Sequence, residues 1–166
     1  MNRSRIAILA AAVSTATWLA FGAGTASATS GAHFFSATAS VADNGALVVI
    51  FDEAGVGQQT VNLTLNANGT ATYACINGGG NHPKASNKQT VSGPVSGSGT
   101  FAPTKNGRVT GSLSAGPPAS TLTCPSGQTF VLACVSYTGI TLTDTTNGVT
   151  ANIEDVSRTF VNIEGC

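Results

Sequence analysis

One loop of this sequence gathers residue types that commonly contact ligands. Residues 77–84 read Asn-Gly-Gly-Gly-Asn-His-Pro-Lys. Three consecutive glycines leave backbone amides uncovered and let a ligand approach closely, while a histidine can titrate near neutral pH and a lysine adds positive charge. A site here would contact an anion or a polar polymer, while the favoured reading is an ordinary long connection after a disulfide-tied strand. The candidate binding residues are Asn77, Gly78, Gly79, Gly80, Asn81, His82 and Lys84.

Acidic residues form two doublets, Asp52-Glu53 and Glu154-Asp155. Two carboxylates that face each other across a cleft can hydrolyse a glycosidic bond. Adjacent residues on a strand point to opposite faces, however, so neither doublet is an acid/base pair by itself. We therefore interpret both doublets as solvated strand ends. Asp144 and Asn147 have a spacing that fits either a calcium ligand pair or an Asx turn.

Motifs of nucleophilic or metal-assisted catalysis are not found in the sequence. It contains neither Gly-x-Ser-x-Gly nor His-Glu-x-x-His, and its only histidines are His33 and His82. The glycine run of residues 78–80 lacks the Gly-Lys-Ser/Thr that follows a phosphate-binding loop. We expect no catalytic residue, no metal and no cofactor, and hence a protein that is not an enzyme.

The N-terminus has the three parts of a secretory signal peptide. Arg3 and Arg5 precede an apolar run from Ile6 to about Gly22, and Ala26-Ser27-Ala28 matches the small-x-small cleavage pattern. The sequence predicts a signal peptide over residues 1–28 and one secreted, extracellular domain over residues 29–166. After cleavage, five basic residues remain against seven acidic ones. This balance offers no field for nucleic acid or for an anionic membrane.

Four cysteines remain after the predicted cleavage: Cys75, Cys124, Cys134 and Cys166. An even number in an exported chain predicts two disulfides, and no Cys-x-x-Cys favours a metal site instead. Three pairings are open to four cysteines. We favour Cys75–Cys124 with Cys134–Cys166, because each of these bonds would tie a strand to a segment that is otherwise loose.

Short segments of alternating polarity, such as residues 60–66 and 90–101, are typical of strands with one face on a core. Five Asn-Gly dipeptides predict type I′ hairpin turns, and Gly116-Pro117-Pro118 predicts a rigid turn. Two apolar segments, 46–51 and 130–135, predict strands that are covered on both faces. The sequence predicts an all-β fold, a single antiparallel, immunoglobulin-like β-sandwich, with a closed β-barrel as the alternative.

Aromatic residues are few, and the predicted mature domain has no tryptophan. Most of its rings occupy inward positions of the predicted strands. Tyr73 and Tyr137 are the only candidates for rings that face solvent, and the favoured reading of each is a core residue with a solvated hydroxyl. A planar aromatic strip for polysaccharide stacking is therefore not predicted, whereas weak binding through hydroxyls and amides stays open as an alternative.

Two stretches have a distinctive sequence, residues 73–101 and residues 124–151. They resemble small secreted proteins of actinomycetes, a group with some fungal relatives. The resemblance implies an exported single-domain protein from a Gram-positive source. It implies no activity, ligand or catalytic residue.

These observations lead to one main functional hypothesis and two alternatives. The main hypothesis is a secreted, non-catalytic, monomeric protein whose loops bind an extracellular macromolecule or a cell-wall polysaccharide. The first alternative is an inhibitor of an extracellular hydrolase that presents either Gly116-Pro117-Pro118 or residues 81–84. The second alternative is a small hydrolase that uses Asp52 or Glu53.

Overall fold

The computed structural model describes residues 31–78 and 87–166, so the expected signal peptide lies outside the described residues. The regular elements in this range are all strands. They are β1 (His33–Val41), β2 (Leu47–Ala54), β3 (Val61–Asn77), β4 (Lys88–Phe101), β5 (Arg108–Ala115), β6 (Gln128–Asp144), β7 (Val149–Ile153) and β8 (Val156–Thr159).

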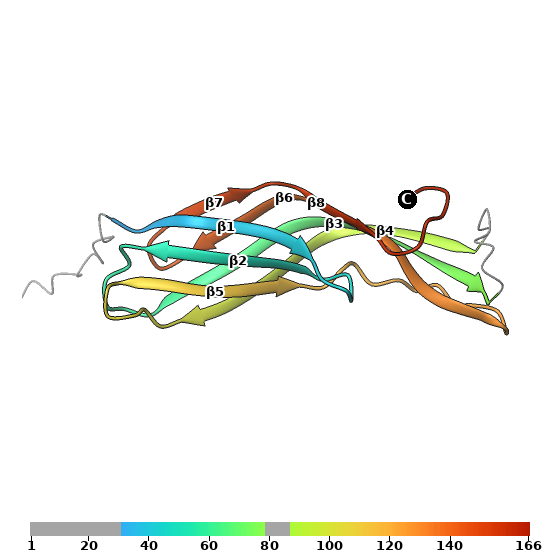
Figure 1. The fold of residues 1–166 in the computed structure, drawn as a ribbon, viewed down its shortest axis with the longest axis horizontal. Coiled ribbons are helices and arrows are strands. Elements are labelled where there is room, and N and C mark those ends of the chain that lie inside the picture. Colours follow the sequence, from blue (N-terminus) through green and yellow to red (C-terminus); the bar gives the residue numbers. More distant parts are fainter. Residues whose placement is uncertain (1–30, 79–86) are drawn as a thin grey trace, which may run out of the picture.

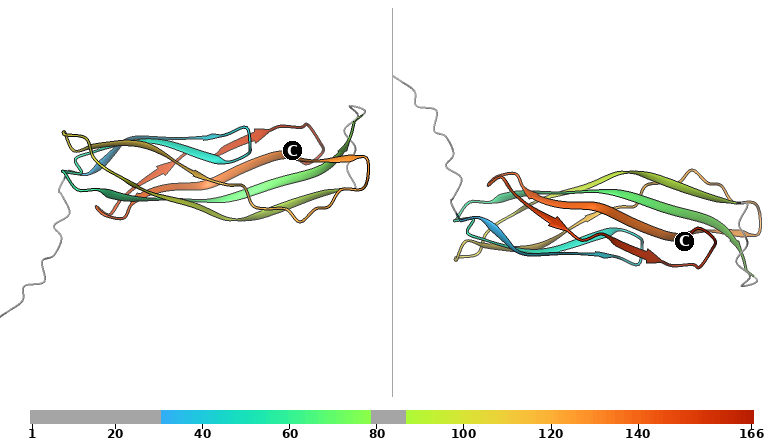
Figure 2. Two further views of the ribbon diagram at one scale, coloured as in Figure 1. Left: turned by 90° about the horizontal axis from the view of Figure 1, so that it is seen from below. Right: turned by 90° about the horizontal axis from the view of Figure 1, so that it is seen from above.

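The strands form two antiparallel sheets that pack face to face (Figures 1 and 2). Sheet A has the order β1-β2-β5, and sheet B has the order β4-β3-β6-β7, with β8 also paired to β6. In the strand lettering of immunoglobulin-like sandwiches, these orders correspond to A-B-E and C′-C-F-G. The predicted sandwich is confirmed, and the alternative of a closed barrel is wrong.

The core lies between the sheets and follows the alternation seen in the sequence. On β2, Leu47, Val49 and Phe51 point inward and are buried, whereas Ile50 points outward and is 60% exposed. The prediction that residues 46–51 are covered on both faces is therefore wrong for the outer face. β2 is central because it pairs with β1 and β5, not because a second layer covers it.

Sheet B is much longer than sheet A, and its far end extends beyond the other sheet (Figure 1). Strands β3 and β6 have 17 residues each, against 8 in β2. The extension is covered on both faces. Segment 116–124 packs over the inner face, where Leu122 joins the main core. The C-terminal residues pack over the outer face, where Ile163 contacts a second small core around Ala74 and Ala133.

A β-bulge at Ala133 explains how the C-terminal segment docks. The register between β3 and β6 shifts at this point, and the carbonyl oxygen of Ala133 accepts hydrogen bonds from the backbone N–H groups of Phe160 and Val161, at 2.8 and 3.0 Å. A bulge leaves one residue outside the ladder, so its carbonyl is free for another partner. The predicted cover on both faces is confirmed for residues 131–135, while Phe130 is 46% exposed.

Two disulfides fasten the two covering segments to sheet B. Cys75 on β3 is bonded to Cys124, and Cys134 on β6 is bonded to Cys166 at the end of the chain. This is the pairing that the sequence favoured. In both cases a strand is tied to a segment without regular structure.

The Asn-Gly dipeptides only partly form the predicted turns. Gly45, Gly107 and Gly148 have positive φ, but no described residue other than glycine does, so these turns are not type I′, which needs two such residues. Asn68-Gly69 lies inside β3, and the turn predicted there is wrong. A Cβ at Gly69 would lie 2.9 Å from Pro118 Cδ and 3.2 Å from Tyr137 Cε1, so the glycine serves close packing instead.

Gly45→Ala is expected to destabilise the protein by about 2–3 kcal/mol in urea unfolding. Gly45 has a φ of 84°, and a Cβ there would overlap Leu132 Cδ2. Its carbonyl also accepts a 2.6 Å hydrogen bond from the Tyr137 hydroxyl, whose pKa burial raises to about 12.

Gly148→Ala is the matched control for this variant. Gly148 has a φ of 71° but nothing within 4 Å of the Cβ position, so only the backbone strain remains, about 1 kcal/mol. Equal losses in the two variants would show that the contact with Leu132 contributes nothing.

Candidate functional site

The predicted glycine-rich loop starts at the far tip of sheet B. Asn77 ends β3 opposite Gln128, and Gly78 follows it with open space around the Cβ position; both are exposed. The other candidate binding residues, Gly79, Gly80, Asn81, His82 and Lys84, lie outside the described residues.

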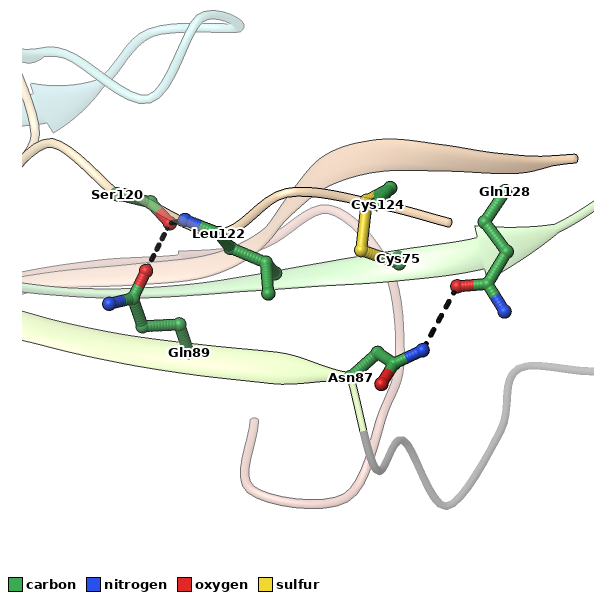
Figure 3. Close-up of a disulfide and its surroundings, with 7 residues drawn as sticks. All are labelled: Cys75, Asn87, Gln89, Ser120, Leu122, Cys124 and Gln128. Carbon is green, nitrogen blue, oxygen red and sulfur yellow. Dashed lines mark hydrogen bonds between the residues drawn. A yellow bond between two sulfur atoms is a disulfide. The ribbon is translucent and has the colours of Figure 1, made fainter. Parts of the chain in front are cut away.

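The base of this loop is fixed by several contacts (Figure 3). The backbone N–H of Cys75 donates to the carbonyl of Asn87 at 3.0 Å, and Asn87 Nδ2 donates to Gln128 Oε1 at 3.3 Å. Cys75 is also the residue that carries the disulfide to Cys124. Both flanks of the loop are thus held by the same end of sheet B.

Segment 116–124 is held against sheet B along its length. Gln89 Oε1 accepts hydrogen bonds from Ser120 Oγ at 2.6 Å and from the Thr121 N–H at 3.0 Å, as Figure 3 shows for Ser120. The Tyr73 hydroxyl donates to the Pro118 carbonyl at 2.8 Å. The segment is irregular, so the predicted turn at residues 116–118 is wrong: the prolines lie in a strap that packs on the domain itself.

Both tyrosines are core residues, and the exposed rings are phenylalanines. Tyr73 and Tyr137 are 7% and 0% exposed, because both side chains lie between the layers and their hydroxyls find backbone carbonyls there. The exposed rings are Phe35, at 71%, and Phe130, at 46%. Phe130 stacks on Tyr73 with ring centroids 5.2 Å apart and an angle of 14° between the ring planes.

The acidic doublet on β2 divides between the two faces of sheet A, as the alternation predicts. Asp52 faces outward and forms a two-pronged ion pair with Arg108, which lowers the pKa of Asp52. Glu53 faces inward and is completely buried, so its interpretation as a solvated strand end is wrong. Alternate residues of β2 face inward, so Glu53 points to the same side as Phe51 and has no access to solvent.

Glu53 lies between the sheets beside Asp144, which is also completely buried. Among the described residues, the Asp144 carboxyl group is the polar group that approaches the two oxygens of Glu53, which make no other hydrogen bond. Asp144 itself accepts three bonds, from the backbone N–H groups of Thr146 and Asn147 and from Asn147 Nδ2. Burial raises the pKa of Glu53 to about 8, and the charge of Asp144 acts in the same direction. Glu53 is therefore protonated at neutral pH.

Asp144 and Asp155 have structural partners. The contacts of Asp144 at Thr146 and Asn147 are those of an Asx turn, the second of the two readings of that spacing. Asp155 Oδ1 accepts a 2.9 Å hydrogen bond from the Gly139 N–H. Over residues 31–78 and 87–166, no group of three or more His, Cys, Asp or Glu residues could hold a metal ion.

The fold and these surfaces define a small, disulfide-bonded β-sandwich with an immunoglobulin-like strand order and a reinforced tip. No family model, curated protein or solved structure matches the chain. Within the described ranges, no helix has the length and apolar character needed to cross a membrane.

Sequence reasoning missed three residues at the tip, Asn87, Gln128 and Phe130. The sequence did indicate that Phe130 lies at the boundary of the covered region, because it follows a polar segment and precedes the buried part of β6. Asn87 precedes β4 and Gln128 begins β6, and these two strands flank β3 in sheet B. Their side chains meet only when all three strands are in register, so no local sequence pattern indicates the hydrogen bond.

Proposed function

We propose that this protein is an exported, non-catalytic binding protein that contacts an extracellular polymer through the tip of sheet B. The observation that carries the proposal is the Phe130 ring, exposed and stacked on the buried Tyr73 ring at the end that a disulfide reinforces. An exposed ring fixed in this way presents apolar area with little loss of conformational entropy on binding.

The chemistry around the ring suits a neutral cell-wall polysaccharide. An aromatic face packs on the apolar C–H patches of a sugar ring. The side-chain amides of Asn77, Asn87 and Gln128 lie at the same end and can donate to or accept from sugar hydroxyls. This arrangement supports a contact made of one ring and several amides.

Three further observations agree with export and with binding rather than catalysis. The N-terminal pattern predicts a signal peptide, and two disulfides are typical of oxidising compartments. Asp52 forms an ion pair with Arg108, and Glu53 is buried away from solvent, so neither carboxyl group is placed to meet a substrate. The resemblance to small secreted actinomycete proteins fits a Gram-positive source and stays a prediction.

The inhibitor alternative has less support. One of its two candidate loops, residues 116–118, belongs to the strap that Tyr73 and Gln89 hold against the domain. The other, residues 81–84, lies outside the described residues. We therefore keep polymer binding as the proposal.

Phe130→Ala is expected to reduce retention of the protein on purified Gram-positive cell walls at least about fivefold, the equivalent of about 1 kcal/mol. The measurement is the fraction of protein that co-sediments with insoluble wall material over a range of wall concentrations.

Phe35→Ala is the matched control, because it removes the other exposed phenylalanine, on β1 in sheet A, where Arg108 lies 5.3 Å from the ring centroid. Its retention should equal that of the unsubstituted protein. Unchanged retention of Phe130→Ala, or equal losses in both variants, would refute a contact at the tip.

A further inference from the structure

The outer face of sheet B carries rows of uncharged polar side chains that cross four strands. One row runs through Ser98, Thr64, Thr143 and Thr150, which are register partners on β4, β3, β6 and β7. A second row runs through Ser92, Thr70, Ser136 and Ser157 on β4, β3, β6 and β8. Neighbours within the rows are linked, as in the Thr143–Thr150 pair at 3.0 Å and the Thr70–Ser92 pair at 2.9 Å.

This face is hollowed where the C-terminal segment crosses it. The hollow measures about 260 Å³, close to the lower end of the range for small-molecule sites. Gly165 and Cys166 form one wall, which the disulfide to Cys134 fixes in place. Six hydroxyl-bearing residues line the rest: Thr70, Thr72, Thr90, Ser136, Ser157 and Thr159.

The hydroxyls of the hollow differ in their availability. Thr72 and Thr90 are bonded to each other at 3.0 Å, and Thr70 is bonded to Ser92. Within the part of the chain that the structure describes, the side chains of Ser136, Ser157 and Thr159 make no hydrogen bond. These three hydroxyls can each donate to and accept from a ligand.

One charged residue contributes to the lining of the hollow, but its side chain lies on the other face of the sheet. Arg158 is the register partner of Val135, which packs in the main core, so it alternates with Ser157 and Thr159 on β8. Its guanidinium bonds the carboxylate of Asp43 at 2.7 Å and the carbonyl of Val41 at 3.0 Å, and it lies 4.9 Å from the Phe160 ring centroid. The other sheet residues that line the hollow are uncharged, which favours a neutral ligand.

From these observations we infer that the hollow between the C-terminal segment and the hydroxyl rows binds one residue of a neutral polysaccharide, whose chain continues along the rows. A neutral sugar offers several hydroxyls, each able to pair with a serine or threonine, and no charge to desolvate. A peptide strand would instead seek an unpaired sheet edge, and this surface is a sheet face.

The site is separate from the proposed contact at the tip. Phe130 lies on the inner side of the extension with its register partner Cys75, whereas Ser136 lies beyond the bulge at Ala133 and points to the outer face. The two proposals can therefore fail independently. Repeated hydroxyl rows also predict that affinity grows with the length of the sugar chain.

The test is native affinity electrophoresis in gels that contain a soluble neutral polysaccharide, with a β-1,3-glucan, a galactomannan and soluble starch as the panel and polygalacturonate as the charged comparison. We expect at least one neutral polymer to retard the protein. Ser157→Val/Thr159→Val should weaken the retardation about tenfold, the effect of losing two hydrogen bonds.

Thr38→Val/Thr110→Val is the matched control, because it makes equivalent changes at exposed positions on sheet A and should leave the retardation unchanged. Thermal unfolding verifies that both double variants fold. As a second readout, amide NMR shifts at Ser136 and Thr159 should move when a short oligosaccharide of the same polymer is added.

Several outcomes would overturn the inference. They are no retardation by any neutral polymer of the panel, stronger retardation by polygalacturonate, or equal retardation of the two double variants. Retardation that is lost in Phe130→Ala but kept in Ser157→Val/Thr159→Val would place the sugar at the tip. That result would refute the hollow and support the proposed function.

Discussion

Glu53→Gln is expected to remove most of the loss of stability that the unsubstituted protein shows between about pH 4.5 and pH 8. Glu53 is completely buried, the polar group that approaches it among the described residues is the Asp144 carboxyl group, and its pKa is raised from the usual 4.5 to about 8. The folded state therefore holds a proton that the unfolded state releases at lower pH. The contribution of Glu53 to the free energy of unfolding is therefore greatest below pH 4.5, and this contribution is lost as the pH rises to about 8.

The expected size of the effect follows from the two pKa values. The stability of the unsubstituted protein should fall by on the order of 3–4 kcal/mol between pH 4.5 and pH 9 through this group. A glutamine keeps the shape of the protonated carboxyl group and can donate a hydrogen bond to Asp144, so its curve should be nearly flat over this interval. Urea unfolding at pH 5, 7 and 9 measures both curves.

Asp52→Asn is the control for this experiment. Asp52 is the sequence neighbour of Glu53, but it points outward and pairs with Arg108, whose side chain is 49% exposed. An exposed ion pair of this kind contributes little to stability, and its loss should leave the decline between about pH 4.5 and pH 8 in place. If the unsubstituted protein were equally stable at pH 5 and pH 9, Glu53 would not hold the proton that we assign to it.

Removing the Cys75–Cys124 disulfide is expected to cost about 4 kcal/mol, from the 49-residue separation that it closes. The second bond, Cys134–Cys166, closes 32 residues, which gives nearly the same value in the chain-entropy model. The paired variants are Cys75→Ala/Cys124→Ala and Cys134→Ala/Cys166→Ala. Guanidinium unfolding gives the free energy for each.

The two variants should differ in where the protein loosens. Without Cys75–Cys124, the strap of residues 116–124 keeps Leu122 in the core and the bond from Tyr73 to Pro118, but its end is free. Without Cys134–Cys166, the C-terminal segment keeps Ile163 and the two hydrogen bonds at Ala133. Hydrogen exchange should rise at residues 73–77 in the first variant and at residues 160–166 in the second. Uniform exchange in both would contradict separate roles.

Several features of the site were available in the sequence and were not used. Glu53 is in phase with Leu47, Val49 and Phe51, and Asp144 is in phase with Leu142, so the alternation already placed both carboxyl groups inside. The assumption that charged residues lie at solvated strand ends overrode that pattern.

The amino-acid sequence alone determined the local and repetitive properties of this protein. Polar and apolar residues that alternate along the chain predicted the strands of an antiparallel sandwich, because side chains two positions apart lie on the same face of a strand. The even number of cysteines predicted two disulfides. Tertiary structure decided what depends on distant partners: the meeting of Glu53 with Asp144 across two sheets, the bond from Tyr137 to Gly45, and the row of hydroxyls beside the C-terminal segment. These contacts join residues from different strands, and their pairing is fixed only when register, bulge and packing are set together.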